Sequence, residues 1–274
     1  MLSLEKSAGL PIRIKDDFLL DFGGELLNAG SEARYFSSMR NFLKDPSSAY
    51  WRKDAYHIYR DVCLREHKEA LAAANLQYDV TVIPPGRIGI EFVKTIGHYH
   101  NSKQRTNIAY PEVYEVVYGR AFWLLQSASE DFERLEEVYL VTASKGEKAV
   151  FPPGFGHVTI NPTDDILVVA NWKSRDCRGI YEPYEIHNGA AYYICESQKL
   201  LASGSTAEDM DFLPNLAYKQ VPELLKVGPR ELSQYDLLTA LPSYFTATKN
   251  LASIDFLNNP ENYLDDLIPE KLFK

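Results

Sequence analysis

Two histidines one residue apart open the part of this chain that is richest in possible metal ligands. His98 and His100 lie in the segment GHYH. Residues i and i+2 of a strand point to the same face, so both imidazoles can enter one site. Glu112 begins the next expected strand, and His157 follows a turn rich in glycine and proline. Three neutral imidazoles and one carboxylate suit a divalent first-row metal, with positions left for water or substrate.

The same residues also have a simpler interpretation. An isolated H-x-H pair is usually two partly exposed polar residues, and a single histidine such as His157 is more often a hydrogen-bonding residue than a ligand. Only the elements that carry these side chains can decide between the two interpretations.

A run of short strands is expected to position them. The segments are spaced by roughly 8–12 residues, with Gly, Pro or Asp at the joints, which is typical of an all-β sandwich or barrel. The expected strands cover residues 78–86, 87–95, 112–119, 121–126, 136–143, 148–154, 157–162 and 165–172, with Ala191–Cys195 as one more.

Helices are expected on both sides of these strands. Residues 31–45, with Ser31 as N-cap, form one predicted helix, and residues 54–74 form a stronger one. The second contains apolar residues at helical spacing, namely Ala55, Ile58, Tyr59, Val62 and Cys63. Short helices and turns are also expected in residues 221–241 and 259–274.

The prediction is therefore a mainly β protein in three parts. Residues 1–77 form an N-terminal helical segment, and residues 78–197 form the barrel. Residues 198–274 form a helical or irregular extension that packs on the barrel or on a partner subunit.

Composition narrows the classes of partner. The formal net charge of −9 argues against a nucleic-acid partner. No basic and apolar leader opens the chain, and no apolar run reaches the roughly 18 residues of a membrane span. The three cysteines do not form a disulfide framework. We expect a soluble cytoplasmic protein with no membrane partner.

Two longer patterns resemble the motifs of the cupin barrel, a jelly-roll fold. In the first, six residues separate Glu112 from Gly119, downstream of the H-x-H pair. The second runs from Gly146 through the PPG turn and His157 to Asn161, and it is matched at every fixed position. The first departs from the family at Phe92, where a glycine is usual. It also departs in the 11 residues between His100 and Glu112, where most cupins have only a few.

A narrower resemblance covers roughly residues 50–195. T-x-G-H-x-H at residues 95–100 and Y-x-E-V-Y at residues 110–114 are similar to the cupin-type phosphoglucose isomerases. The resemblance implies an aldose-ketose isomerase that interconverts glucose 6-phosphate and fructose 6-phosphate, a step of glycolysis and gluconeogenesis. It also implies a homodimer and one divalent metal per subunit, most often iron, with manganese, nickel or zinc as other candidates.

The resemblance assigns roles to ten residues. It implies that Glu112 is catalytic and that the metal ligands are His98, His100, Glu112 and His157. It further implies that the substrate is bound by Thr81, Thr95, Gly97, Tyr110, Tyr114 and Tyr181, the first three at the phosphate. The family also has a histidine near the tyrosine at Tyr181, and none is nearby here.

Two questions stay open at this level. Proton transfer through a cis-enediol, with Glu112 as the base, and a hydride shift between C1 and C2 both fit the residues. A different sugar-phosphate isomerase, a dioxygenase or a non-catalytic sugar-binding cupin is the alternative function. Four cations near the expected site are each more often solvated surface charges than phosphate ligands: Lys94, Arg105, Arg175 and Arg178.

Overall fold

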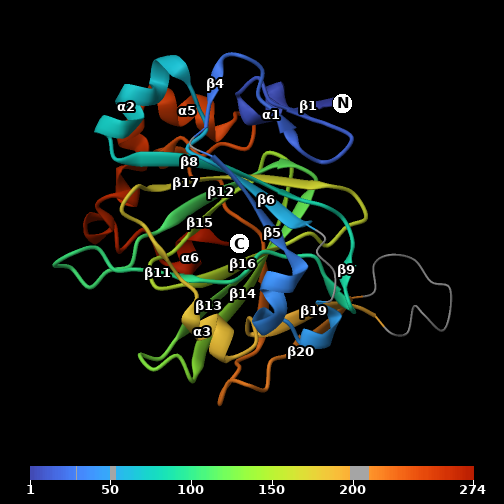
Figure 1. The fold of residues 1–274 in the computed structure, drawn as a ribbon. Helices are drawn as coiled ribbons and strands as arrows, with labels where there is room; N and C mark the ends of the chain where they lie inside the picture. The colour runs from blue at the N-terminus through green and yellow to red at the C-terminus, as the bar shows by residue number, and fades with distance from the viewer. Residues whose placement is uncertain (29, 50–53, 198–209) are drawn as a thin grey trace.

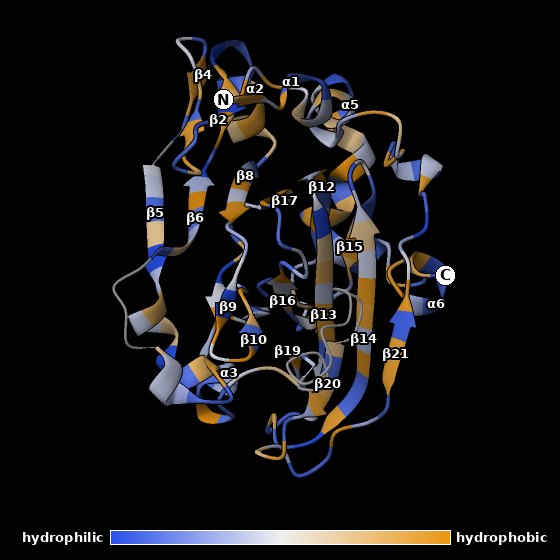
Figure 2. Ribbon diagram, turned by 90° about the vertical axis from the view of Figure 1, so that its right-hand side faces the viewer, coloured by the Kyte–Doolittle hydropathy of each residue, from blue (hydrophilic) through white to orange (hydrophobic). Residues whose placement is uncertain are grey.

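Two β-sheets face each other across the centre of the molecule (Figure 2). The computed structural model describes residues 1–28, 30–49, 54–197 and 210–274. The larger sheet has the strand order β15-β12-β17-β8-β6-β5. Its strands are β5 (Gly30–Tyr35), β6 (Asp54–Arg60), β8 (Leu76–Ile83), β12 (Glu112–Tyr118), β15 (Lys148–Phe151) and β17 (Leu167–Ser174).

The opposing sheet has the order β16-β13-β14-β21. Its strands are β13 (Arg120–Ala128), β14 (Leu135–Ser144), β16 (Gly156–Ile160) and β21 (Leu224–Val227). Aromatic rings pack between the two sheets: Trp123 of β13 is fully buried, with its ring centroid 5.6 Å from Phe151 and 5.9 Å from Tyr114. The expected cupin jelly-roll barrel is confirmed.

Short strands close the ends of the barrel. A three-stranded sheet near the N-terminus contains β1 (Leu2–Ser3), β2 (Arg13–Ile14) and β3 (Leu20–Asp21), and a two-stranded one pairs β4 (Leu26–Leu27) with β7 (Cys63–Leu64). At the opposite end lie β9 (Arg87–Ile88), β10 (Glu91–Phe92), β19 (Tyr192–Glu196) and β20 (Met210–Pro214) (Figure 1). A further pair joins β11 (Tyr99–His100) to β18 (Gly179–Ile180).

Helices are few and short in the described residues. The α-helices are α1 (Glu5–Ala8), α2 (Lys68–Ala73), α3 (Glu182–Ile186), α5 (Ser243–Lys249) and α6 (Pro269–Leu272). Helices of 3₁₀ type are η1 (Phe36–Phe42), η2 (Pro46–Ser48), η3 (Arg65–His67), η4 (Ser233–Tyr235), η5 (Leu251–Leu257) and η6 (Pro260–Asn262). None of the helices described has the length and apolarity needed to cross a bilayer.

The two long helices expected near the N-terminus are wrong over most of their length, since only the 3₁₀ helices η1 and η3 and the helix α2 form within them. Residues 31–35 belong to strand β5, so Ser31 caps nothing, and most of residues 54–74 is strand β6, strand β7 and a 3₁₀ turn before α2. Strand β6 is covered on both faces, which leaves Ala55, Tyr56, His57 and Tyr59 all buried. A strand buried on both faces loses its polar-apolar alternation and can imitate a helical period.

Because β5 pairs with β6 and β6 pairs with β8, the sheet of the barrel begins before residue 78. The helix expected in residues 221–241 is wrong in part, since β21 forms there and pairs in parallel with β14. The division into parts at residues 77 and 197 stays a prediction. Residues 198–209 of the expected C-terminal extension lie outside the described residues.

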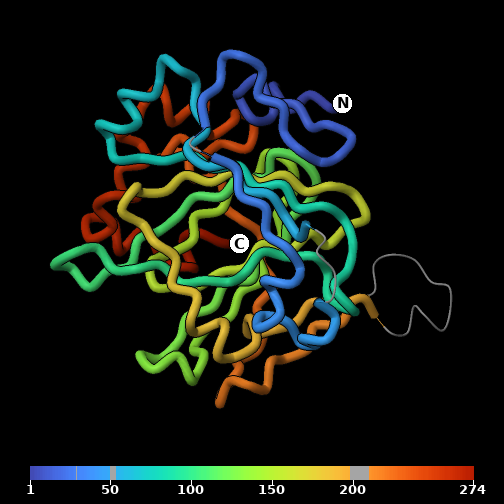
Figure 3. Tube along the Cα trace, in the orientation of Figure 1, coloured from blue at the N-terminus to red at the C-terminus, as the bar shows by residue number. Residues whose placement is uncertain are grey.

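The C-terminal extension packs on the larger sheet. Tyr244 of α5 stacks on Trp172 of β17, with ring centroids 5.8 Å apart. Beside it, the backbone N–H and hydroxyl of Ser243 donate to the buried carboxylate of Glu115, which also pairs with Lys148 at 2.9 Å. The loop of residues 101–111 extends away from the barrel on the left of Figure 3. It is tied to the same extension by Lys103, whose Nζ lies 2.5 Å from Glu261.

Candidate active site

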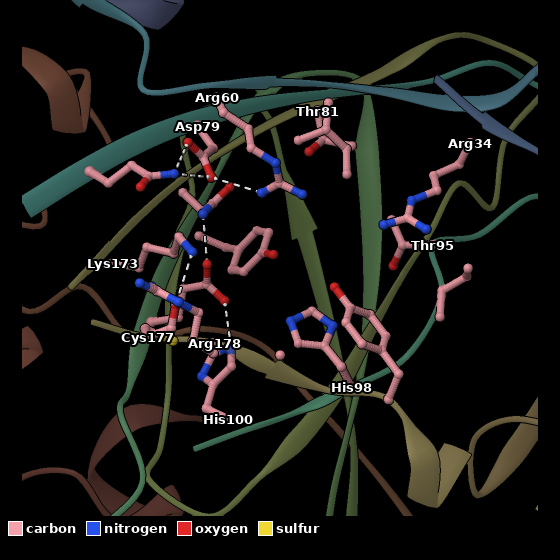
Figure 4. A pocket seen from close by; sticks show the side chains of 18 of the residues that line it. Arg34, Arg60, Asp79, Thr81, Thr95, His98, His100, Lys173, Cys177 and Arg178 are labelled. Carbon is pink, nitrogen blue, oxygen red and sulfur yellow. Dashed lines mark hydrogen bonds and ion pairs between the residues drawn. The ribbon is translucent and has the colours of Figure 1, made fainter. Parts of the chain in front are cut away.

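A cavity of about 680 Å³ opens on the inner face of the larger sheet and is lined mostly by polar side chains. Strands β5, β6, β8, β12 and β17 supply its inward-facing residues, and the segment before β11 and the turn after β17 supply others. Figure 4 shows His98 and His100 at one end, with Arg178 beside His100, and Arg34, Arg60, Thr81 and Thr95 toward the other end. A buried cavity with converging polar groups is the usual form of a small-molecule site.

Four of the predicted residues meet at one end of this cavity, where His98, His100 and Glu112 line it and His157 packs against them. His98, His100, Glu112 and His157 each offer an atom within 4.8 Å of the others. Oε2 of Glu112 lies 3.3 Å from Nε2 of His100 and 3.4 Å from Nε2 of His157. His98 and His157 face each other across an isolated antiparallel bridge, so residues 59 positions apart are held side by side. The strand positions predicted from the sequence therefore bring the four donors together.

Several of these atoms are buried without a hydrogen-bond partner. They are Nδ1 of His98, Oε2 of Glu112 and both ring nitrogens of His157. Buried polar atoms of this kind are costly unless something satisfies them. A divalent cation bound by three imidazoles and one carboxylate would do so, and the donor set fits it.

The protonation of the cluster supports the same conclusion. Burial lowers the pKa of His98 to about 3 and that of His157 well below its usual range, so both rings are neutral and have free lone pairs. Burial opposes protonation of His100 as well, but Cys177 and Glu112 raise its pKa to about 10. Burial would raise the pKa of Glu112, yet His100 lowers it. A proton on His100 thus balances the carboxylate, and a metal cation would replace that proton.

Neighbouring groups fix the orientation of two of the four candidate donors. Nδ2 of Asn171, on β17, donates to Oε1 of Glu112 at 2.6 Å. Nδ1 of His100 lies 2.8 Å from the carbonyl oxygen of Tyr110, which leaves Nε2 turned toward Glu112. Partners of this kind hold metal ligands in one orientation and raise their basicity.

Comparison with known proteins decides the family. Residues 34–209 match the family model described as "Glucose-6-phosphate isomerase (GPI)". The chain belongs to the glucose-6-phosphate isomerase family. It is an enzyme of the cupin-type branch, as the resemblance of the motifs implied.

The relatives of this family member come from archaea. Glucose-6-phosphate isomerase of Pyrococcus abyssi is 29% identical over 163 residues, which cover 58% of this chain and 76% of that protein. Glucose-6-phosphate isomerase of Thermococcus litoralis is 30% identical over 161 residues, covering 56% and 73% respectively. Among solved structures, pumpkin seed globulin aligns with a TM-score of 0.37 and 11% identity, over 58% of this chain and 36% of that chain.

The predicted substrate residues of this glucose-6-phosphate isomerase family member divide into two groups. The cavity is lined by Thr81, Thr95, Tyr114 and Tyr181. The ring of Tyr181 lies 5.1 Å from that of His98, and Tyr114 stacks on Phe151 at 4.5 Å.

Two predicted substrate residues do not line the cavity. Tyr110 reaches the site through its carbonyl oxygen, which orients His100. Gly97 is needed for packing, since a Cβ there would lie 2.3 Å from the ring of Tyr184 and 2.7 Å from Val158. A role for Gly97 at the phosphate would have to come from its backbone.

Sequence reasoning missed other cavity residues. Asn171 and Lys173 alternate inward on β17, and a polar residue in the apolar run DILVVANW was the available signal for Asn171. Arg34 and Arg60 were placed on helices and went unnoticed. Of the four cations weighed from the sequence, Arg175 and Arg178 line the cavity, while Lys94 is buried and donates to the carbonyl of Phe42 at 2.7 Å.

Proposed function

We propose that this protein interconverts glucose 6-phosphate and fructose 6-phosphate with the help of one divalent metal ion per subunit. The observation that carries the proposal is the convergence of His98, His100, Glu112 and His157 at one end of a cavity that Thr81 and Thr95 also line. Membership of the glucose-6-phosphate isomerase family supports the same substrate class. The four residues are proposed as the metal ligands, with iron favoured and manganese, nickel or zinc also compatible.

A bound divalent ion would act as a Lewis acid that stabilises negative charge developing on the substrate oxygens. The chain itself would move the proton. Isomerisation takes a proton from C2 of the aldose and returns it to C1, and Glu112 is the proposed carrier. Its Oε2 faces the imidazoles, which leaves Oε1, held by Asn171, as the oxygen for the proton.

Other side chains would hold the sugar. The hydroxyl of Thr95 accepts from the backbone N–H of Thr159 at 3.0 Å, so its own proton is free for a phosphate oxygen. Thr81 lines the wall beside it, and Tyr114 and Tyr181 flank the ligand cluster. Proton transfer is the route we favour over a hydride shift, because a buried carboxylate whose Oε1 is oriented by Asn171 suits the carrier role.

The proposed reaction belongs to glycolysis and gluconeogenesis, and the cytoplasm is its proposed place. A homodimer, expected for this fold, is also a proposal.

The test is direct. Purified protein is given fructose 6-phosphate, and glucose 6-phosphate is followed with a coupled dehydrogenase. We expect turnover that a chelator abolishes and that Fe²⁺, Mn²⁺, Ni²⁺ or Zn²⁺ restores. Running the reaction in deuterated water separates the routes, since proton transfer incorporates deuterium at C1 or C2 and a hydride shift does not. No turnover with any of the four metals would overturn the proposed substrate.

A further inference from the structure

The residues proposed for the phosphate carry no charge, although a sugar phosphate carries about two negative charges at neutral pH. Thr81 and Thr95 offer hydroxyls only. Burying a dianion without a cation nearby is unfavourable, and natural phosphate sites commonly include arginine. The chain therefore needs a positive group at this end of the cavity, and the molecule is acidic overall.

Arg34 is in position to supply that charge. It lies on β5, opposite Tyr56 of β6, and its side chain enters the cavity beside Thr95 (Figure 4). Its Nη2 lies 2.8 Å from Glu32, which fixes the guanidinium plane. Its Nε is buried and has no hydrogen-bond partner. One edge of the guanidinium thus carries a donor that nothing satisfies.

The other cations of the cavity are already occupied. Arg60 lies between Glu32 at 3.2 Å and Asp79 at 3.5 Å. Arg175 donates both terminal nitrogens to Asp61, at 3.0 and 2.6 Å, in a two-bond pair, although its Nε is buried without a partner. Nζ of Lys173 donates to the carbonyl of Cys177 at 3.3 Å, and Arg178 also donates to backbone carbonyls. Among the cations that line the cavity, Arg34 combines an unpaired donor with a position beside Thr95 and has a single carboxylate contact.

We propose that Arg34 binds the phosphate group of the sugar phosphate and sets the preference for phosphorylated over neutral sugars. The proposal rests on the proposed function only for the identity of the ligand. Glu32 holds the guanidinium in place, and Nε donates to a phosphate oxygen while the hydroxyl of Thr95 donates to another. Strand β5, which the sequence did not place in the barrel, becomes a specificity element.

The test measures the binding of inorganic phosphate by calorimetry, which does not depend on turnover. Arg34→Gln should weaken binding by at least about tenfold, since a hydrogen bond between charged groups is lost. The phosphate affinity of Arg34→Lys should lie between that of the wild type and that of Arg34→Gln, because lysine keeps the charge and lacks the planar set of donors. Arg13→Gln, an exposed position on β2 outside the cavity, makes the same change in net charge and should leave binding unchanged.

Steady-state kinetics with fructose 6-phosphate separates binding from chemistry. Arg34→Gln should raise KM about tenfold or more with kcat kept within a few-fold, because the lost contact is present in both ground and transition states. Phosphate affinity in Arg34→Gln equal to that of the wild type, in a variant with unchanged melting temperature, would overturn the proposal. An inactive wild type that still binds phosphate through Arg34 would overturn the proposed reaction and leave this inference standing.

Discussion

The two ends of the cavity treat their polar groups in opposite ways. At the ligand end, His100, Glu112 and His157 are 8%, 3% and 1% exposed, and several of their atoms lack a partner. At the cation end, the side chains of Arg34 and Arg60 are 28% and 37% exposed, and both already pair with Glu32.

This difference suits the end with the histidines and Glu112 to the chemical step and the end with Arg34 and Arg60 to binding of the substrate. Buried imidazole nitrogens and carboxylate oxygens without a hydrogen-bond partner favour the binding of a cation strongly, because no other group compensates the loss of their contacts with water. Partly exposed cations that already have a carboxylate partner contribute less to the free energy of substrate binding, and that contribution falls as the salt concentration rises. Changes at the ligand end should therefore be large and lower kcat, and changes at the cation end should be smaller and raise KM.

The largest effect is expected from Glu112→Gln. The amide cannot accept a proton at neutral pH and is a poor metal ligand, so kcat should fall by at least about 10³-fold. The rate of glucose 6-phosphate formation measures this, with calorimetric phosphate binding as the control for an intact cation end. A kcat within tenfold of the wild type would remove Glu112 from the chemistry.

Asn171→Ala should have the next largest effect. It removes the donor that holds Oε1 of Glu112, and loss of such a supporting partner costs roughly 10- to 100-fold in activity or metal affinity. Asn171→Asp should be worse than alanine, because a second carboxylate then faces the first. Measuring kcat in the two variants checks this. Equal losses in both would show that Asn171 contributes by packing and not through its hydrogen bond to Glu112.

Salt should distinguish the two ends without any mutation. Above about 0.1 M ionic strength the Debye length falls below about 10 Å, which weakens attraction between phosphate and partly exposed arginines. We expect KM for fructose 6-phosphate to rise by roughly several-fold between low salt and about 0.5 M, while kcat stays nearly constant. A fall in kcat at constant KM would contradict the proposed division between the ends.

The smallest effect is expected outside both ends, at the insert of residues 101–109. None of its residues lines the cavity, and Lys103 ties it to Glu261 by a partly exposed ion pair. Lys103→Ala should change stability by about 1 kcal/mol or less and leave KM and kcat unchanged. Thermal unfolding and kinetics of the variant measure both, and an altered KM would mean that the insert does control substrate access.

The sequence predicted which four possible metal donors come together, and it missed the arginines at the other end of the cavity, for a physical reason. His98 and His100 share a strand face by local geometry, and the motifs around Glu112 and His157 are contiguous in the chain. Arg34 reaches the cavity only because β5 pairs with β6 and β6 with β8. Such pairing between distant segments leaves no mark in local composition.

The same reason explains the errors in the fold. The central strands from β12 to β17 are separated by turns that contain Gly, Pro or Asp. These residues mark the strand ends, so the sequence predicts the bounds of the strands to within a few residues. Strand β6 has buried residues on both faces, and its tyrosines and isoleucine fit a strand only once its neighbours are known. Asn171 acts on Glu112 across 59 positions of sequence, a contact that only the sheet reveals.

The central claim is that the four donors hold one divalent ion. Metal content per subunit, measured by mass spectrometry on the purified protein and on His157→Ala, tests it most directly. His67→Ala is the matched control, because His67 bonds to Tyr244 away from the cavity. The account predicts one equivalent of metal in the wild type and in His67→Ala, and almost none in His157→Ala. Full metal content in folded His157→Ala, or none in the wild type after reconstitution, would contradict it.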